Sequence, residues 1–116
     1  MSGKLSTHVL DVANGCPARG VQLELRNLDT GNLLVSQITN HDGRTDAPLL
    51  GPGEMKIGRY ELLFYLGDYF KARGAALTTP PFLDQVPIRF AIADTQAGYH
   101  VPLLATPWSY TTYCGS

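Results

Sequence analysis

Six residues alternate strictly between apolar and polar side chains, Val21-Gln22-Leu23-Glu24-Leu25-Arg26. Successive side chains of a β-strand point to opposite faces of a sheet. This spacing therefore predicts a strand that turns Val21, Leu23 and Leu25 toward a core and the residues between them toward water. The same period of two recurs through Val86, Ile88, Phe90 and Ile92. The chain is predicted to be an all-β protein.

Short segments rich in Gly, Pro, Asn and Asp break the chain at short intervals, as they do in a sandwich or barrel. Gly67 to Gly74 begins with an Asp cap and ends on Gly, which predicts one short helix. Between Asp46 and Gly58 periodicity is weak, and we expect a short edge strand followed by a loop. Seven or eight strands result, at residues 5–12, 21–26, 33–39, 59–66, 86–93, 99–105 and 108–113, with the edge strand as the eighth.

Length and composition indicate one compact domain over residues 1–116, with 44% hydrophobic residues, 16% charged residues and a formal net charge of −1. This balance argues against a disordered polyelectrolyte and against a basic nucleic-acid binder. A small neutral partner or another protein fits better. Neither a secretory h-region nor an apolar run long enough to span a bilayer is present, so we expect no membrane association and a cytoplasmic location.

Cys16 and Cys114 are the two cysteines of the chain. Their number is too small for a disulfide framework, and their spacing matches neither a zinc ribbon nor a redox pair. We interpret both as reduced thiols.

Two of the three histidines, His8 and His100, lie in strand-like runs among apolar neighbours. A buried imidazole needs hydrogen-bond partners, and one such residue alone is best explained as a satisfied core histidine. Two of them facing one cavity could instead supply a general base and its orienting partner. Zinc held by His8, His100 and a thiol is an alternative, although the ligands are scattered and no spacing supports it.

The turn Asn40-His41-Asp42-Gly43 places His41 at an exposed position and leaves Arg44 at the turn exit. Arg44 is either a solvated cation or a guanidinium that binds a carbonyl-rich ligand or stabilises an oxyanion. Other catalytic signatures are absent from the sequence. It contains no G-x-S-x-G elbow, no phosphate-binding Gly-rich loop, no H-E-x-x-H and no dinucleotide-binding fingerprint.

Four blocks of sequence, in order and nearly end to end, carry a family resemblance. They are Leu5-Ser6-Thr7-His8-Val9-Leu10-Asp11, Asn40-His41-Asp42-Gly43-Arg44, Gly67-Asp68-Tyr69-Phe70, and the closing stretch Tyr99-His100-Val101-Pro102-Leu103-Leu104 with Trp108-Ser109-Tyr110-Thr111-Thr112-Tyr113. They resemble the 5-hydroxyisourate hydrolases of the transthyretin-like protein family. Long blocks of this kind are far more specific than a short motif.

The resemblance implies a transthyretin (prealbumin)-like sandwich of two four-stranded sheets with one short helix. It also implies a homotetramer, assembled as a dimer of dimers, whose central channel holds the active sites. The implied reaction is hydrolysis of 5-hydroxyisourate to 2-oxo-4-hydroxy-4-carboxy-5-ureidoimidazoline, in the degradation of urate to allantoin within purine catabolism. The substrate is an activated cyclic amide, and the resemblance implies neither a metal nor an organic cofactor.

Site residues follow from the same resemblance. The family's first histidine corresponds to His8, its arginine to Arg44, its second histidine to His100, and its terminal tetrapeptide to Tyr113-Cys114-Gly115-Ser116. We expect His8, oriented with the help of His100, to activate a water, and Arg44 to bind substrate oxygens. The catalytic set is His8, Arg44, His100 and Ser116, and the substrate-binding set is His8, Arg44, Tyr113, Cys114 and Gly115.

Cys114 departs from the family, whose tail reads Tyr-Arg-Gly-Ser, and Gly98 stands where a histidine is common. A thiol in place of a guanidinium removes charge-assisted hydrogen bonds. The alternative function is therefore a transthyretin-like binding or carrier protein for a small ligand, with weak or no catalysis. In transthyretin, a hormone carrier, the two histidines and the arginine are replaced, so their retention favours the enzyme. A structural sandwich domain for protein contacts would leave His8 and His100 unexplained.

Overall fold

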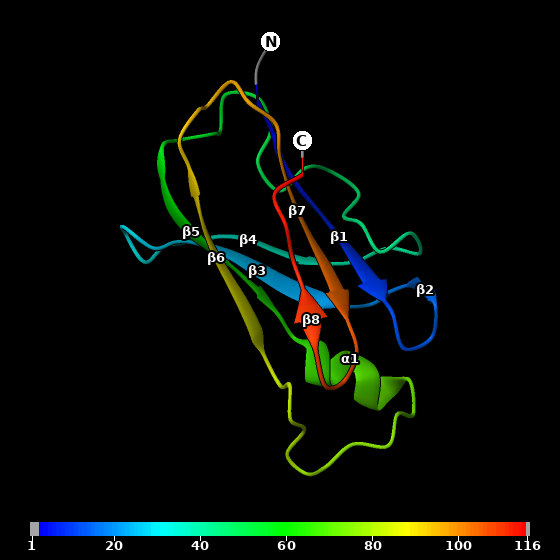
Figure 1. Ribbon diagram of the computed structural model, residues 1–116. Helices are drawn as coiled ribbons and strands as arrows, with labels where there is room; N and C mark the ends of the chain where they lie inside the picture. The colour runs from blue at the N-terminus through cyan, green and yellow to red at the C-terminus, as the bar shows by residue number, and fades with distance from the viewer. Residues whose placement is uncertain (1–2, 116) are drawn as a thin grey trace.

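The computed structural model describes residues 3–115 and shows two four-stranded sheets packed face to face (Figure 1). The first sheet has the strand order β2-β1-β7-β8, and the second has the order β4-β3-β5-β6. One short helix, α1, lies at one end of the sandwich. The predicted all-β class, the two sheets of four strands and the single helix are confirmed.

The bounds of the elements follow the predicted runs closely. The first sheet consists of β1 (Leu5–Asp11), β2 (Cys16–Pro17), β7 (Tyr99–Ala105) and β8 (Tyr110–Thr111). The second sheet consists of β3 (Gln22–Asn27), β4 (Leu33–Ile38), β5 (Gly58–Phe64) and β6 (Val86–Ile92), and helix α1 spans Leu66–Ala72. No helix within residues 3–115 has the length and apolar character needed to cross a membrane.

Strand β1 pairs with β7 in parallel, whereas the other strand pairs are antiparallel. The ladder runs from Leu5 opposite Tyr99 to Asp11 opposite Ala105. The buried Thr7 hydroxyl donates a hydrogen bond of 2.7 Å to the Val101 carbonyl across this ladder. The pairing therefore joins the first and the last long strands of the chain in one sheet, in one register.

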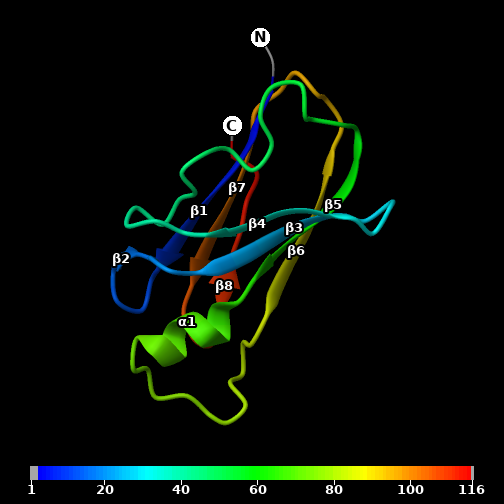
Figure 2. The same cartoon turned by 180° about the vertical axis from the view of Figure 1, so that it is seen from behind.

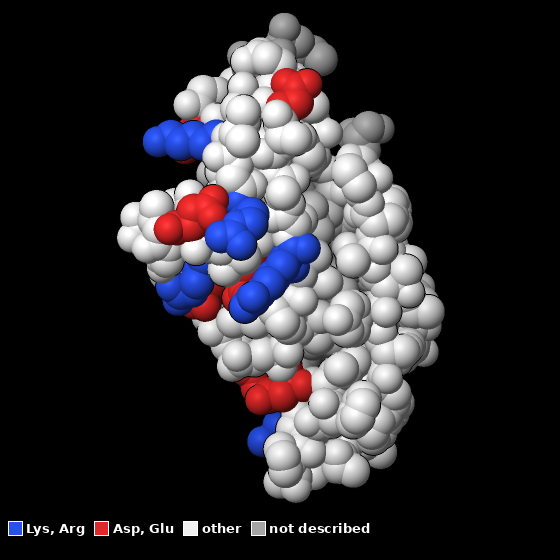
Figure 3. Space-filling view, turned by 60° about the vertical axis from the view of Figure 1, so that its left-hand side comes forward, with Lys and Arg blue, Asp and Glu red and all other residues white. Residues whose placement is uncertain are grey.

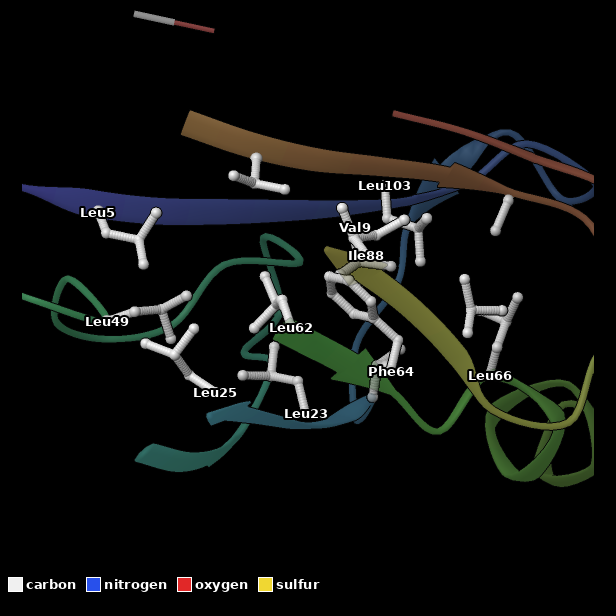
Figure 4. Packing of buried hydrophobic residues seen from close by; sticks show 14 of the residues in the cluster. Leu5, Val9, Leu23, Leu25, Leu49, Leu62, Phe64, Leu66, Ile88 and Leu103 are labelled. Carbon is white, nitrogen blue, oxygen red and sulfur yellow. The ribbon is translucent and has the colours of Figure 1, made fainter. Parts of the chain in front are cut away.

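The core fills the space between the sheets (Figure 4). Leu5, Val9 and Leu103 of the first sheet face Leu23 and Leu25 of the second, and all five side chains are fully buried. Burying a side chain of this size contributes roughly 1.5–3 kcal/mol. The alternation of apolar and polar residues in the sequence thus correctly predicted that Leu23 and Leu25 face the core.

The segment from 46 to 57 differs from the prediction, because the short edge strand expected there is absent and only an isolated bridge joins Leu50 to Leu5. Pro48 and Pro52 lack the N–H that a ladder needs. The N–H of Gly51 is taken by the Glu54 side chain at 2.7 Å. This loop therefore touches β1 at one point without extending the sheet.

Two strand boundaries also differ from the prediction. Cys16 and Pro17, expected to lie wholly within a turn, form the two-residue strand β2 against the end of β1. The last strand is shorter than the predicted 108–113, since the Thr106 hydroxyl accepts hydrogen bonds from the N–H groups of Trp108 and Ser109 and holds them in a turn.

Helix α1 begins earlier than predicted, because its N-cap is Tyr65, which makes no side-chain capping bond. Asp68 lies in the first turn, where its carboxylate interacts favourably with the positive end of the helix dipole. The predicted stop at Gly74 is confirmed. Its φ of +80° suits glycine, and the N–H groups of Gly74 and Ala75 bond back to Lys71 and Phe70 in a Schellman motif.

A buried carboxylate links this helix to the end of β1. Asp11 accepts a hydrogen bond of 2.8 Å from the Tyr69 hydroxyl and bonds of 2.7 and 2.9 Å from the side chain and backbone of Asn14. Burial acts to raise the pKa of Asp11, but these hydrogen bonds outweigh it and leave the pKa below its ordinary value. The pKa of Tyr69 is raised far above its usual range, mainly by burial and secondly by the hydrogen bond to Asp11.

Replacing Tyr69 with Phe is expected to lower the free energy of unfolding by about 1–3 kcal/mol, since the buried Asp11 loses one donor. Urea unfolding measures this loss, with Ser36→Ala on the exposed strand β4 as control. The folded-state pKa of Asp11 is lowered, so its stabilisation is present above the unfolded pKa of about 3.9 and is lost as pH falls through the folded value. The gap between wild type and Tyr69→Phe should therefore narrow in acid. Equal stabilities near neutral pH would contradict this account.

Candidate active site

His8 and His100 share the outer face of the first sheet. In β1, Leu5, Thr7 and Val9 point inward, so His8 takes the outward side, and it is half-buried. His100 stands between inward-facing residues of β7 and is likewise half-buried. His8 lies opposite Pro102 in the ladder, two positions beyond the pair formed by Ser6 and His100. The two imidazoles therefore occupy neighbouring strands of one face.

The turn from Asn40 to Arg44 packs directly on β1 and closes on itself (Figure 2). The Asn40 side-chain oxygen accepts hydrogen bonds from the N–H groups of Asp42 and Arg44, at 2.9 and 3.2 Å. The Val9 N–H donates to the Gly43 carbonyl at 2.8 Å. Gly43 has a φ of +76°, and a Cβ at this position would collide with the Val9 carbonyl oxygen. Only glycine lets the turn approach β1 this closely.

This turn brings a backbone carbonyl to His8. The distance from His8 Nε2 to the Asp42 carbonyl oxygen is 2.7 Å. A carbonyl can only accept a hydrogen bond, so Nε2 carries the proton. In the neutral ring Nδ1 is then the atom with the free electron pair, and it is the one that can act as a base.

Arg44 and His8 both act electrostatically on His100. Burial lowers the pKa of His100 below its ordinary value, and the charge of Arg44 and the presence of His8 lower it further. His100 is therefore neutral at neutral pH. The structure brings together three residues that the sequence predicted for the site, His8, Arg44 and His100. His41 is exposed, as predicted, and lies 3.5 Å from the Asp42 carboxylate.

The C-terminal tail runs along the strand that carries His100. The N–H of His100 donates to the Gly115 carbonyl at 3.1 Å, and the N–H of Gly115 donates to the His100 carbonyl at 2.7 Å. A Cβ on Gly115 would stand 3.0 Å from the His100 Cβ and 3.1 Å from Cδ2. Glycine therefore allows the tail to lie against the imidazole. Ser116, also predicted for the site, lies outside the described residues.

Tyr113 and Cys114 line a cavity of about 230 Å³ between the tail and the edge strand β6. The members of this cavity from β7 are Tyr99 and Val101, which alternate with His100 and belong to the opposite face of the strand. Both Tyr113 and Cys114 are exposed at the surface. The structure thus places Gly115 against His100 and the other two side chains at this neighbouring cavity.

Sequence reasoning missed two contributions to the site, the Asp42 carbonyl at His8 and the Ser6 hydroxyl, which lies 2.9 Å from Nδ1 of His100. The turn signal of Asn40 to Gly43 was visible, but a contact made by a backbone carbonyl depends on how the turn packs on β1. Among residues 3–115 no group of three or more His, Cys, Asp or Glu side chains could hold a metal ion. The zinc alternative therefore finds no support there.

Together these features define a small β-sandwich protein with a histidine pair and an arginine on the outer face of one sheet. The sequence profile of the HIUase/Transthyretin family matches residues 5–115, and the chain belongs to this family.

Three known proteins illustrate the similarity. The 5-hydroxyisourate hydrolase of Deinococcus radiodurans is 54% identical over 120 residues, with all of both chains covered. The structure of Klebsiella pneumoniae 5-hydroxyisourate hydrolase superimposes with a TM-score of 0.83 at 34% identity, again over all of both chains. Sea bream transthyretin, solved in complex with thyroxine, gives a TM-score of 0.84 at 24% identity, covering 97% of this chain and 94% of that one. The last likeness concerns the fold alone.

Exchanging Gly43 for Ala is expected to lower the free energy of unfolding by at least about 1 kcal/mol, because alanine is strained at positive φ. It should also displace the Asp42 carbonyl and release Nε2 of His8. Nitrogen NMR of the histidine rings reports the tautomer of His8, which should change from one dominant form to a mixture.

Asp42→Asn is the matched control, since it alters the side chain and keeps the carbonyl. Its His8 spectrum should equal that of wild type. A wild-type His8 protonated mainly on Nδ1 in the neutral ring would show that the assigned hydrogen bond is wrong.

Proposed function

We propose that this chain hydrolyses 5-hydroxyisourate to 2-oxo-4-hydroxy-4-carboxy-5-ureidoimidazoline in the degradation of urate. The observation that carries the proposal is the convergence of His8, Arg44 and His100 on one face of the first sheet. Full-length similarity to proteins named 5-hydroxyisourate hydrolase, at 54% and 50% identity, supports it. The carrier alternative is less favoured, because the similarity to the thyroxine-bound transthyretin is 24% identity.

His8 acts as the general base in this proposal. With Nε2 bonded to the Asp42 carbonyl, Nδ1 accepts the proton of the attacking water. Protonation turns the ring into an imidazolium, and the hydrogen bond to the carbonyl becomes charge-assisted and stronger. The carbonyl therefore both orients the ring and stabilises its charged form.

Arg44 supplies positive charge where the substrate oxygens bind. Arg44 is exposed and takes part in none of the ion pairs within residues 3–115, which suits a guanidinium that binds a ligand. A guanidinium offers five N–H donors, which suit a substrate rich in carbonyl oxygens. It would stabilise the oxyanion that forms when water adds to the ring carbonyl.

The reaction balances without an added reagent. The water oxygen forms a bond to the carbonyl carbon of the cyclic amide, and its proton passes to His8. The C–N bond of the resulting tetrahedral intermediate then breaks, and the protonated base returns the proton to the leaving nitrogen. The former carbonyl carbon becomes the carboxyl group of the product, and the freed nitrogen becomes the NH2 end of its ureido group. Roles for Tyr113, Cys114, Gly115 and Ser116 at the substrate remain predictions.

An uncharged surface beside the site supports the proposed homotetramer, a dimer of dimers. The stretch from Tyr99 to Gly115 contains no Asp, Glu, Lys or Arg. In the view of Figure 3, charged side chains lie on the left and in the centre, and the right-hand part shows none. Trp108 and Tyr110 are exposed on this stretch. Uncharged surface of this kind with exposed aromatic residues is typical of subunit interfaces.

Sedimentation equilibrium measures the assembly directly. We expect a mass of four times the 12.6 kDa protomer, and a smaller species for Tyr110→Arg, which would place a charge in the interface. Ser36→Arg on β4 of the other sheet is the control and should leave the mass unchanged. A wild-type protein that stays monomeric at assay concentrations would contradict the proposed tetramer.

A cytoplasmic location and catalysis without a cofactor also remain proposals. Cys16 and Cys114 are both free thiols, which suits a reducing compartment. The proposed reaction needs proton transfer and charge stabilisation, and protein side chains provide both.

The activity test follows the decay of freshly generated 5-hydroxyisourate with and without the protein. His8→Ala should lower kcat/KM by about 10²–10⁴, the usual contribution of a general base, and Arg44→Ala by about 10²–10³. His100→Ala should also reduce the rate. His41→Ala is the matched control, because His41 is the exposed third histidine, and its rate should equal that of wild type.

Decay no faster than the spontaneous reaction, combined with saturable binding of the substrate, would contradict the enzyme and favour the carrier alternative.

The variant Cys114→Arg tests how the thiol in the tail, which replaces the family's arginine, affects the rate of hydrolysis. Because an arginine restores a cation with five donors, we expect this variant to turn over faster than wild type. A slower variant would show that the thiol does not weaken this site.

A further inference from the structure

Ser6 lies beside His100 in the site, and the proposed mechanism has not used it. The two residues are Cα partners in the parallel ladder between β1 and β7. Leu5 and Thr7 on either side of Ser6 are buried in the core, so Ser6 takes the outward face that also carries His8 and His100. Its hydroxyl oxygen lies 2.9 Å from Nδ1 of His100, which is hydrogen-bond distance.

We propose that Ser6 is a positioning residue for the reaction, whose hydroxyl holds Nδ1 of His100 and thereby leaves Nε2 of His100 as the atom that meets the substrate. The inference rests on the proposed hydrolase function. An imidazole has two ring nitrogens, and a partner held at one of them sets the ring orientation and leaves the other nitrogen to meet a ligand.

The strand pairing gives this contact its rigidity. Thr7, the next residue, is buried and bonded to the Val101 carbonyl at 2.7 Å, which locks the two strands in register. On its other side the His100 ring lies against Gly115 of the tail. The imidazole is thus held at Nδ1 by Ser6 and packed against the tail, and rotation about its side-chain bonds is restricted.

A serine hydroxyl is suited to this position because it can either donate to a bare Nδ1 or accept from a protonated one. His100 can therefore gain or lose a proton without losing its partner. The Asp42 carbonyl at His8 accepts only, and it fixes one tautomer. The two histidines of the site are consequently held in different ways, His8 as a base with one defined proton and His100 as a ring that can change its protonation.

Ser6→Ala, Ser6→Thr and the control Ser36→Ala on β4 test this inference in the full-length protein. We expect Ser6→Ala to lower kcat about tenfold with KM changed less than twofold, as for an interaction that matters in the transition state. Ser6→Thr, which keeps the hydroxyl, should recover most of kcat. In nitrogen NMR spectra, the ring signals of His100 should shift in Ser6→Ala but not in Ser6→Thr or Ser36→Ala. The ring signals of His41 should not shift in any of the three variants. All three variants should unfold at urea midpoints close to that of wild type.

The outcomes separate this inference from the proposed function. An active wild type with full kcat and unchanged His100 signals in Ser6→Ala would overturn the role of Ser6 and leave the hydrolase function standing. A Ser6→Ala defect that Ser6→Thr fails to relieve, or one that appears equally in Ser36→Ala, would likewise overturn it. A wild type that does not accelerate decay would overturn the proposed function, and the role of Ser6 in that reaction with it.

Discussion

The parallel pairing of β1 with β7 is the constraint on which the site depends. Ser6 and His100 are 94 positions apart in the chain, and only this ladder makes them neighbours. Because side chains alternate along each strand, a register slip of one residue would send either His8 or His100 into the core. The core residues of β1 and β7 therefore fix the geometry of the site as firmly as they fix the fold, and the buried Thr7 bond to Val101 reinforces that register.

Two segments without regular structure add the remaining groups of the site to those held by the ladder. The turn from Asn40 to Arg44 rests on β1 and brings a carbonyl to His8 and a guanidinium near His100. The tail pairs with the backbone of His100 through Gly115. In both segments a glycine permits the close approach, since a side chain at Gly43 or Gly115 would press on the neighbouring strand. The chemistry thus depends on backbone contacts as much as on the side chains of the site.

The sequence predicted the strands and their buried faces well, because the period of two at Leu23 and Leu25 is a direct consequence of burial on one face. The arrangement of the strands as two four-stranded sheets was implied by the family resemblance. The sequence also predicted His8, Arg44 and His100 as site residues, the histidines partly from their rarity among apolar strand residues and all three from the family resemblance. The structure places the three close enough that Arg44 and His8 both influence His100. It could not predict the bond from His8 to the Asp42 carbonyl, which carries no side-chain signature. The edge strand expected within residues 46–58 does not form. Pro48 and Pro52 have no backbone N–H to donate to a ladder, and the Glu54 side chain accepts the N–H of Gly51. The hydrophobic periodicity of the sequence does not reveal this competition for backbone N–H groups.

The central claim is that His8, Arg44 and His100 form one electrostatic cluster on the outer face of the first sheet. An NMR titration of the His100 ring in wild type and in Arg44→Gln tests it most directly, with Arg19→Gln beside α1 as a control for a remote cation. The account predicts a pKa of His100 below about 6.5 in wild type, a rise toward that value in Arg44→Gln and no change in Arg19→Gln. An ordinary pKa of His100 in wild type that stays unchanged in Arg44→Gln would contradict it.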